Sequence, residues 1–121
     1  MILIKEFSFD AAHNLIKYNG KCEKLHGHTY KMVVKLEGIP DSEGMIMDFV
    51  MLKNIVKAEV IDILDHSYIN EIIEQPTAEN IAVWAWGKLD GKLKRDNCKL
   101  SEVEIWETRT SGVIYKGDRL K

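Results

Sequence analysis

The two ends of the chain alternate with the two-residue period of β-strands, whereas the middle follows helical spacing. Residues 29–37 show the strand period most clearly, because every second residue is apolar and those between are mostly charged. The apolar series is Tyr30, Met32, Val34 and Leu36. This pattern predicts an antiparallel strand that buries one face and exposes the other.

Three further segments have strand character. Residues 2–9 are rich in aromatic and β-branched types and predict a strand that ends near Asp10. Residues 100–107 alternate again, and residues 113–115 follow a predicted turn at Ser111-Gly112.

Two helices are predicted between these strands. Asp48 can cap a helix that runs to about Leu64, and Thr77 can cap a second helix that reaches Leu89. The apolar spacing predicts core contacts for the first helix through Phe49, Leu52, Val56, Val60 and Ile63, and for the second through Ile81, Trp84 and Ala85.

The predicted element order is therefore ββααββ. Strands at both ends with helices between them indicate an α+β fold whose helices cover one face of an antiparallel sheet. A length of 121 residues fits one domain, residues 1–121. The other face of the sheet stays largely uncovered, so association through the sheet edges is a reasonable hypothesis.

Composition excludes several classes of protein. A formal charge of −2 argues against a nucleic-acid-binding surface. No apolar run approaches the roughly 20 residues that a membrane helix needs. Because Met1 leads directly into a strand-like segment without a secretory signal, we expect a cytoplasmic protein. Cys22 and Cys98 are then best interpreted as free thiols.

Three of the four histidines fall in one strand–loop–strand unit. His26 and His28 are two residues apart at the start of the second strand, so both imidazoles project to one face. Antiparallel pairing would bring His13, at the end of the first strand, level with them. Three imidazoles with an open fourth position are typical of catalytic zinc, so we predict a Zn²⁺ site.

Cys22 lies four residues before this pair, and its spacing leaves three roles open. It could be a fourth zinc ligand, a base or nucleophile with a lowered thiol pKa, or an inert buried thiol. Sequence pattern alone gives little weight to three other residues. His66 after Asp65 fits ordinary chemistry at a helix end, and Glu107 fits a solvated strand end.

Six short motifs, in this order along nearly the whole chain, resemble the 6-pyruvoyl-tetrahydropterin synthase family. They are Phe9-Asp10-Ala11-Ala12-His13, Cys22-Glu23-Lys24-Leu25-His26-Gly27-His28, Met47-Asp48-Phe49 with Leu52-Lys53, Leu64-Asp65-His66, Pro76-Thr77-Ala78-Glu79-Asn80, and Glu107-Thr108.

The resemblance implies the tunnelling fold, a four-stranded antiparallel sheet with two helices, assembled as two stacked trimers with active sites between subunits. It implies zinc on His13, His26 and His28. Cys22, Asp65 and His66 match the catalytic triad of the family, and Glu107 with Thr108 matches the site that anchors the pterin ring. These implied roles replace the weaker interpretations from pattern alone.

Within the family, the spacing from Cys22 to His26-Gly27-His28 resembles the branch that forms 6-carboxytetrahydropterin in queuosine biosynthesis. The implied reaction converts 7,8-dihydroneopterin triphosphate and releases acetaldehyde and triphosphate. Glu23 matches the residue with which another branch forms 6-hydroxymethyl-dihydropterin, so a dual-function enzyme stays open, as do a pyruvoyl-forming enzyme and a non-catalytic zinc- or pterin-binding protein. Candidates for binding the triphosphate are Lys17, Lys24, Arg109 and Lys116.

Overall fold

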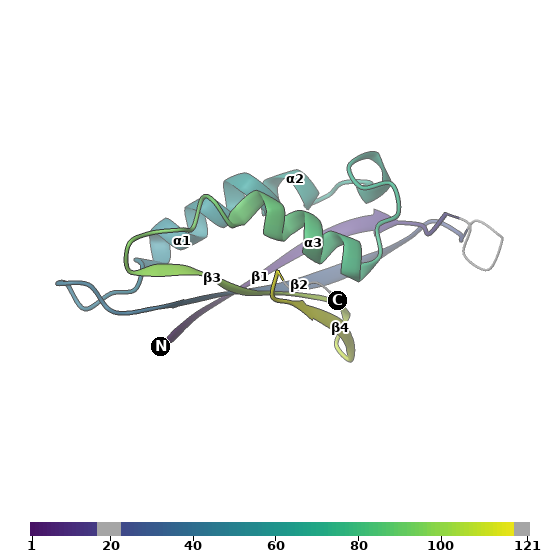
Figure 1. Ribbon diagram of the computed structural model, residues 1–121. Coiled ribbons are helices and arrows are strands. Elements are labelled where there is room, and N and C mark those ends of the chain that lie inside the picture. The colour runs from purple at the N-terminus through teal and green to yellow at the C-terminus, as the bar shows by residue number, and fades with distance from the viewer. Residues whose placement is uncertain (17–22, 118–121) are drawn as a thin grey trace.

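The computed structural model describes residues 1–16 and 23–117. Its strands form one antiparallel sheet in the order β1-β2-β3-β4, and its helices lie over one face of that sheet (Figure 1). The strands are β1 (Ile2–His13), β2 (His26–Gly38), β3 (Cys98–Thr108) and β4 (Ser111–Tyr115). The predicted order ββααββ and the α+β fold class are confirmed.

β1 and β2 are both longer than the sequence pattern predicts. Their ladder pairs twelve residues without a bulge, from Ile2 with Glu37 to His13 with His26. Within the ladder, Thr29 donates a 2.6 Å side-chain hydrogen bond to the carboxylate of Asp10. Aspartate has a low strand propensity, so the sequence pattern predicts that the first strand ends near Asp10. In the structure, pairing with β2 extends this strand by three residues, to His13.

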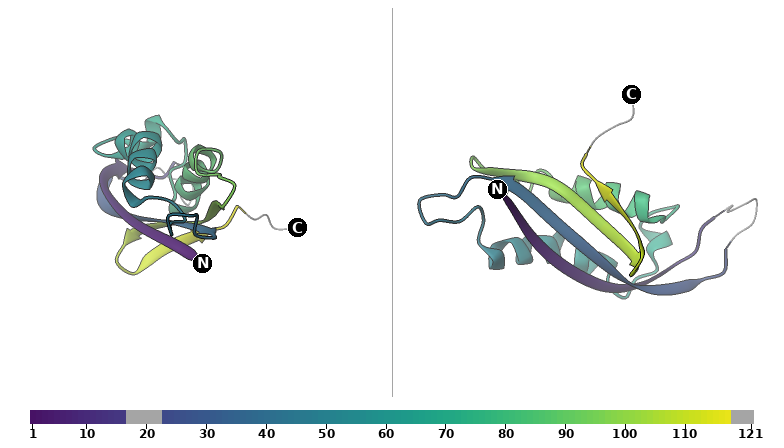
Figure 2. Two further views of the ribbon diagram at one scale, coloured as in Figure 1. Left: turned by 90° about the vertical axis from the view of Figure 1, so that its left-hand side faces the viewer. Right: turned by 90° about the horizontal axis from the view of Figure 1, so that it is seen from below.

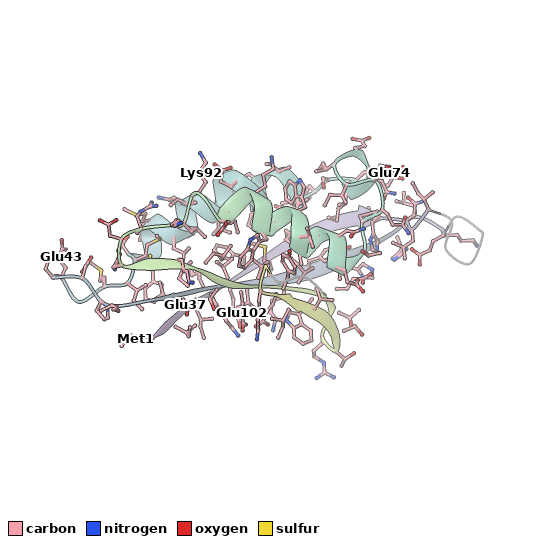
Figure 3. All side chains as sticks on the ribbon, viewed as in Figure 1. Met1, Glu37, Glu43, Glu74, Lys92 and Glu102 are labelled. Atoms are coloured by element: carbon pink, nitrogen blue, oxygen red, sulfur yellow. The ribbon has the colours of Figure 1, made fainter. Side chains whose placement is uncertain are left out.

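The core lies between the sheet and the helices. Tyr30, Met32, Val34 and Leu36 are fully buried there, as the alternation predicts. The opposite face carries charged side chains, and Glu37 and Glu102 project away from the helices (Figure 3). On that face the Lys35 amine binds Glu102 at 3.1 Å and Glu104 at 2.7 Å. Views from the end and from below show the same two layers (Figure 2).

The first helical segment consists of α1 (Phe49–Val56), a π-helical turn (Lys57–Ile61) and α2 (Asp62–Leu64). The Asp48 carboxylate caps it, accepting from the Met51 amide at 3.0 Å. The predicted core contacts of Leu52, Val56 and Val60 are confirmed.

Two predicted core residues of this helix, Phe49 and Ile63, are exposed, and that part of the prediction is wrong. A π-helical turn holds one extra residue, so it rotates the following residues about the helix axis. Ile63 therefore turns outward and Leu64 inward. Phe49 belongs to the first turn, where Val50 and Met51 are exposed as well.

The second predicted helix is α3 (Ala78–Leu89). The Thr77 hydroxyl caps it by accepting from the Asn80 amide at 3.1 Å. Ile81, Ala85 and Leu89 are fully buried. Trp84 is only partly buried and packs against the margin of the core.

The predicted turn at Ser111-Gly112 is wrong, because both residues belong to β4 and the turn lies just before them. Gly112 pairs with Trp106 across the ladder. A Cβ atom on Gly112 would lie 2.4 Å from Cδ2 of Trp106, so glycine is needed there for close packing and not for a turn.

No helix in residues 1–16 and 23–117 is both long and apolar enough to cross a bilayer. The side chains buried between the sheet and the helices belong to one core cluster. The assignment of residues 1–121 to one domain and the cytoplasmic location stay predictions.

Substitution of Gly112 by alanine is expected to lower the free energy of unfolding by about 1–3 kcal/mol, because the new methyl group overlaps the Trp106 ring. Gly87→Ala is the matched control. A Cβ at Gly87, inside α3, meets nothing within 4 Å, so this change should stabilise by about 0.5–1 kcal/mol through helix propensity. Urea unfolding measures both, and equal effects would contradict the packing argument.

Candidate metal centre and active site

The β1–β2 ladder brings three histidine side chains together at one end of the sheet. His13 pairs directly with His26, and His28 follows two residues later on the same face. The Nε2 atoms of His13 and His26 are 3.1 Å apart, and the His28 ring centroid lies 4.8 Å from that of His26. The predicted convergence of the three imidazoles is thus observed.

Backbone carbonyl groups orient two of these rings. The carbonyl of Pro76 lies 2.8 Å from Nδ1 of His13, and the carbonyl of Lys24 lies 2.9 Å from Nδ1 of His26. Because a carbonyl only accepts, each Nδ1 carries the proton of this contact, and Nε2 is the ring nitrogen that faces the cluster. The Pro76 contact orders a ring that is almost fully buried.

Glu107 joins the same cluster from β3. Its Oε1 atom lies 3.2 Å from Nε2 of His13 and 3.0 Å from Nε2 of His28. The ligand atoms of all four residues lie within 4.8 Å of one another. Local sequence pattern does not predict this contact, because it depends on the pairing of β3 with β2. In the sequence, only the strand alternation and the family motif at Glu107 point to a functional role for this residue.

This donor set fits a metal ion. Lone pairs on imidazoles and a carboxylate repel one another unless a proton or a cation lies between them. Nitrogen and carboxylate oxygen are ordinary zinc ligands, and tetrahedral ligands at about 2.0–2.1 Å from zinc are roughly 3.3 Å apart. The separations of 3.0–3.2 Å here are close to that value.

His28 is suited to bind a metal in its neutral form. Burial lowers its pKa; the carboxylate of Glu107 opposes this shift, and the imidazoles of His13 and His26 add to it. A ring that is neutral near pH 7 offers its lone pair without first losing a proton. Beneath the cluster, the fully buried Tyr30 meets His28 edge-on at 5.5 Å between ring centroids.

Some predicted residues lie outside the described part of the chain, namely Cys22 and Lys17. Glu23 is described: its carboxylate accepts from the Leu15 amide at 3.1 Å and lies 3.8 Å from Nδ1 of His26. It therefore stands on the outer side of the histidine cluster. Lys24 is exposed and contributes its carbonyl to the orientation of His26.

Thr108 and Arg109 are exposed where β3 ends, next in sequence to Glu107. The Thr108 hydroxyl accepts from the Thr110 amide at 3.4 Å, so it helps to form the β3–β4 turn. Lys116 contacts Glu102 at 3.8 Å, on the uncovered face of the sheet.

Asp65 and His66 form a second cluster, at the β1 edge. Nδ1 of His66 lies 3.1 Å from the Asp65 carboxylate, and Asp65 accepts from the Asp10 amide at 2.9 Å. His66 adopts a left-handed backbone with φ 59°, which is rare for non-glycine residues. Its amide donates to the carbonyl of Asp10, which fixes this conformation against β1.

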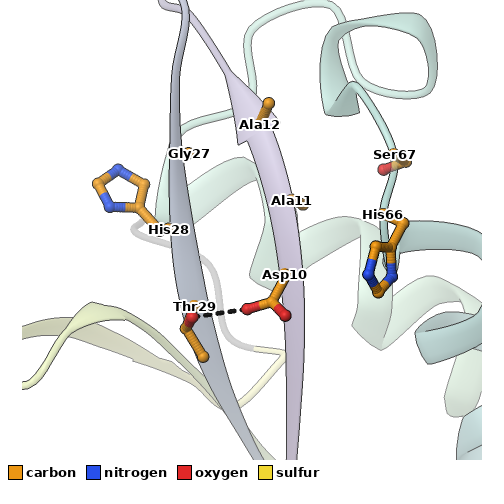
Figure 4. A pocket seen from close by; sticks show the side chains of 8 residues that line it. All are labelled: Asp10, Ala11, Ala12, Gly27, His28, Thr29, His66 and Ser67. Carbon is orange, nitrogen blue, oxygen red and sulfur yellow. Dashed lines mark hydrogen bonds between the residues drawn. The ribbon is translucent and has the colours of Figure 1, made fainter.

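The two clusters lie on opposite sides of the β1–β2 pair. Figure 4 shows His28 beyond β2 and His66 beyond β1, with Asp10 and Thr29 between them. A surface cavity of about 490 Å³ runs along this region and is lined by both histidines. The His66 side chain is 79% exposed, so its ring faces outward and is not part of the three-histidine cluster. The sequence did not single out Asp10 or Thr29.

Comparison with known proteins agrees with this arrangement. A family model described as 6-pyruvoyl tetrahydropterin synthase matches residues 2–118. The chain belongs to this family. The 6-carboxy-5,6,7,8-tetrahydropterin synthase of Synechocystis sp. is 40% identical, with 98% of this chain and 95% of that protein covered. A dihydroneopterin monophosphate aldolase of Pyrococcus furiosus is also 40% identical, covering 92% and 93%.

Among solved structures, the 6-pyruvoyl tetrahydropterin synthase of Caenorhabditis elegans superimposes with a TM-score of 0.79 at 27% identity. The match covers 98% of this chain and 96% of that one. The predicted tunnelling fold is therefore confirmed, and the family resemblance seen in the sequence is confirmed with it.

The Asp65 carboxyl group should titrate below the normal range for aspartate. The Asp10 amide is the main cause of its lowered pKa, and His66 contributes as well. A lowered folded-state pKa stabilises the protein above the unfolded-state pKa, and this stabilisation is lost as pH falls through the folded-state value. Asp65→Asn should therefore cost most stability near neutral pH and almost none near pH ~2.

Carbon-detected NMR of the carboxyl group measures this pKa, and urea unfolding at a series of pH values measures the stability difference. Asp62→Asn serves as the control, since Asp62 is exposed and forms an ion pair with the exposed Lys57 at 3.3 Å. A normal pKa for Asp65, or a stability cost independent of pH, would contradict the assignment of the Asp10 amide as its partner.

Proposed function

We propose that the chain is a zinc-dependent 6-carboxytetrahydropterin synthase of queuosine biosynthesis. It would convert 7,8-dihydroneopterin triphosphate and one water molecule to 6-carboxytetrahydropterin, acetaldehyde and triphosphate. The observation that carries this proposal is the convergence of His13, His26 and His28 in a member of this family. The similarity to the Synechocystis synthase supports the choice of branch.

His13, His26 and His28 would hold the zinc ion through their Nε2 atoms. When bound there, zinc supplies a Lewis acid that polarises the hydroxyl groups of the substrate side chain. The neutral state of His28 and the carbonyl-held ring of His13 prepare these ligands before the metal binds.

Glu107 would accept two N–H groups from the aminopyrimidine edge of the pterin, a pairing that a carboxylate makes well. Thr108 stands next to it at the strand end. Cys22 would act as the base that removes a proton from the substrate side chain, and His66, steadied by Asp65, would be the partner acid or base.

A second candidate is cleavage that yields 6-hydroxymethyl-dihydropterin, alone or beside the carboxy-forming reaction. The aldolase of Pyrococcus furiosus shares the same 40% identity with this chain as the synthase of Synechocystis, over 92% of the chain against 98%. Glu23 lies 3.8 Å from Nδ1 of His26 and could act as the base for this reaction. A pyruvoyl-forming enzyme and a non-catalytic pterin-binding protein stay as further alternatives.

Product analysis decides among these activities. We expect zinc-loaded protein to convert dihydroneopterin triphosphate to 6-carboxytetrahydropterin with equimolar acetaldehyde, measured by mass spectrometry and an acetaldehyde assay. Cys22→Ala should keep its zinc and lose about 10²–10⁴-fold in kcat, as expected for removal of a general base. Hydroxymethyl-dihydropterin as the main product, abolished by Glu23→Ala, would establish the second candidate instead, and no turnover at all would favour the non-catalytic one.

The active site would be completed between subunits of a homo-oligomer, a hexamer built from two trimers. Within one chain His66 lies across the β1–β2 pair from His28, and its ring is exposed. β1 and β4 are edge strands, and edges of this kind can pair with a second copy. The exposed first turn of α1, with Phe49, Val50 and Met51, offers further apolar surface for assembly.

Mixing two inactive variants tests the shared site. Cys22→Ala and His66→Ala should each be inactive alone. If Cys22 and His66 of one site come from different chains, co-refolded mixtures should regain about one quarter of wild-type activity, because random pairing restores that share of intact sites. Absence of any recovery in mixed oligomers, verified by native mass spectrometry, would place both residues in the same chain's site.

A further inference from the structure

The Glu107 carboxylate lies inside the ring of imidazoles. Strand alternation puts Glu107 on the helix-covered face of β3, as it does the buried Val103 and Ile105. Trp106 pairs with Lys31, so Glu107 stands beside the β2 segment that carries His28. Its Oε1 atom is 3.0 Å from Nε2 of His28 and 3.2 Å from Nε2 of His13.

The nitrogens that Glu107 contacts distinguish a metal ligand from a supporting residue. A carboxylate that supports a metal-bound histidine accepts from the ring nitrogen that faces away from the metal. In His13 and His26 that nitrogen is Nδ1, and backbone carbonyls already occupy it. Glu107 instead faces the Nε2 atoms, on the side where the metal would bind.

The separations agree with this distinction. Oε1 of Glu107 is as far from its two imidazole nitrogens as the Nε2 atoms of His13 and His26 are from each other, 3.0–3.2 Å against 3.1 Å. These three separations match those between ligands of a tetrahedral ion, and all four ligand atoms lie within 4.8 Å of one another. The fully buried ring of Tyr30 lies beside His28 and His13, at 5.5 and 6.0 Å between ring centroids.

We propose that Glu107 is the fourth ligand of the metal while no pterin is bound, and that pterin binding removes it from the metal. This inference rests on the proposed function. A carboxylate that accepts two parallel N–H groups from an aminopyrimidine edge must align both oxygens with that edge, so Oε1 would turn away from the imidazole nitrogens. Recognition of the ring would therefore open the fourth coordination position for the substrate side chain, and the closed site would become a catalytic one.

Metal affinity and the cobalt spectrum test this inference without an activity assay. Zinc affinity is measured by competition with a chromophoric chelator for wild type, Glu107→Gln and Glu102→Gln. Glu102 is the matched control, because it lies on the same strand, faces the opposite side and leaves Lys35 paired with Glu104 at 2.7 Å. Glu107→Gln should bind zinc roughly 10- to 100-fold more weakly, and Glu102→Gln as tightly as wild type.

Co²⁺-substituted protein reports the ligand set directly, since its visible spectrum depends on coordination geometry. The Glu107→Gln spectrum should differ from that of wild type. Neopterin, which has the aminopyrimidine edge but no triphosphate, should shift the wild-type spectrum as Glu107 leaves the metal.

The outcomes separate the two proposals. Equal zinc affinity and identical cobalt spectra for wild type and Glu107→Gln would overturn the fourth-ligand role while the three-histidine site stands. Loss of zinc in His28→Ala together with wild-type affinity in Glu107→Gln would lead to the same conclusion. Failure of wild type itself to bind zinc would overturn the proposed function and this inference with it.

Discussion

The register of β1 against β2 is the constraint on which the rest of the structure depends. Twelve consecutive pairs without a bulge place Phe9 beside Tyr30 in the core and His13 beside His26 at the end of the sheet. Side chains alternate with a period of two, so a slip of one residue would turn the apolar series outward and separate the imidazoles. The same ladder that buries the core therefore assembles the candidate metal centre, and packing of the Tyr30 face holds the register that brings the histidines together.

Much of this could be predicted from sequence, because it depends on local periodicity and on neighbouring strands. The alternation from Tyr30 to Leu36 gave the buried face, and the caps Asp48 and Thr77 gave both helix starts. The predictions were wrong where the environment of a residue depends on structure outside its own sequence segment. A π-helical turn exchanged Ile63 for Leu64 in the core, and the role of Gly112 depends on a Trp106 ring that only strand pairing brings to it. The contact of Glu107 with the histidines likewise needs the β2–β3 register.

At the candidate metal centre, packing holds together acceptor atoms that repel one another electrostatically. His13 is almost fully buried, yet its Nε2 faces another imidazole nitrogen and a carboxylate oxygen. Such a group of acceptors in a poorly hydrated site is unfavourable until a cation or protons neutralise it. Backbone carbonyls of Pro76 and Lys24 restrain two rings, so the arrangement does not relax by turning the imidazoles over. The folded chain thus orients these rings before any ligand binds, so ligand binding loses less free energy in ordering them.

The separation of the two polar clusters follows from the same sheet. Asp65 and His66 dock onto the outer edge of β1 through the Asp10 backbone, and the Ser67 carbonyl accepts from the Ala12 amide. The clustered imidazole nitrogens lie instead on the helix-covered face. A two-stranded ladder stands between them, and neither side chain can cross it without breaking backbone hydrogen bonds. His28 and His66 nevertheless line one surface cavity, so a small molecule that engages both clusters of one chain would have to lie along Asp10 and Thr29. In the proposed assembly a second chain would instead bring its own β1 edge to the histidines of the first, and the exposed ring of His66 is available for that contact.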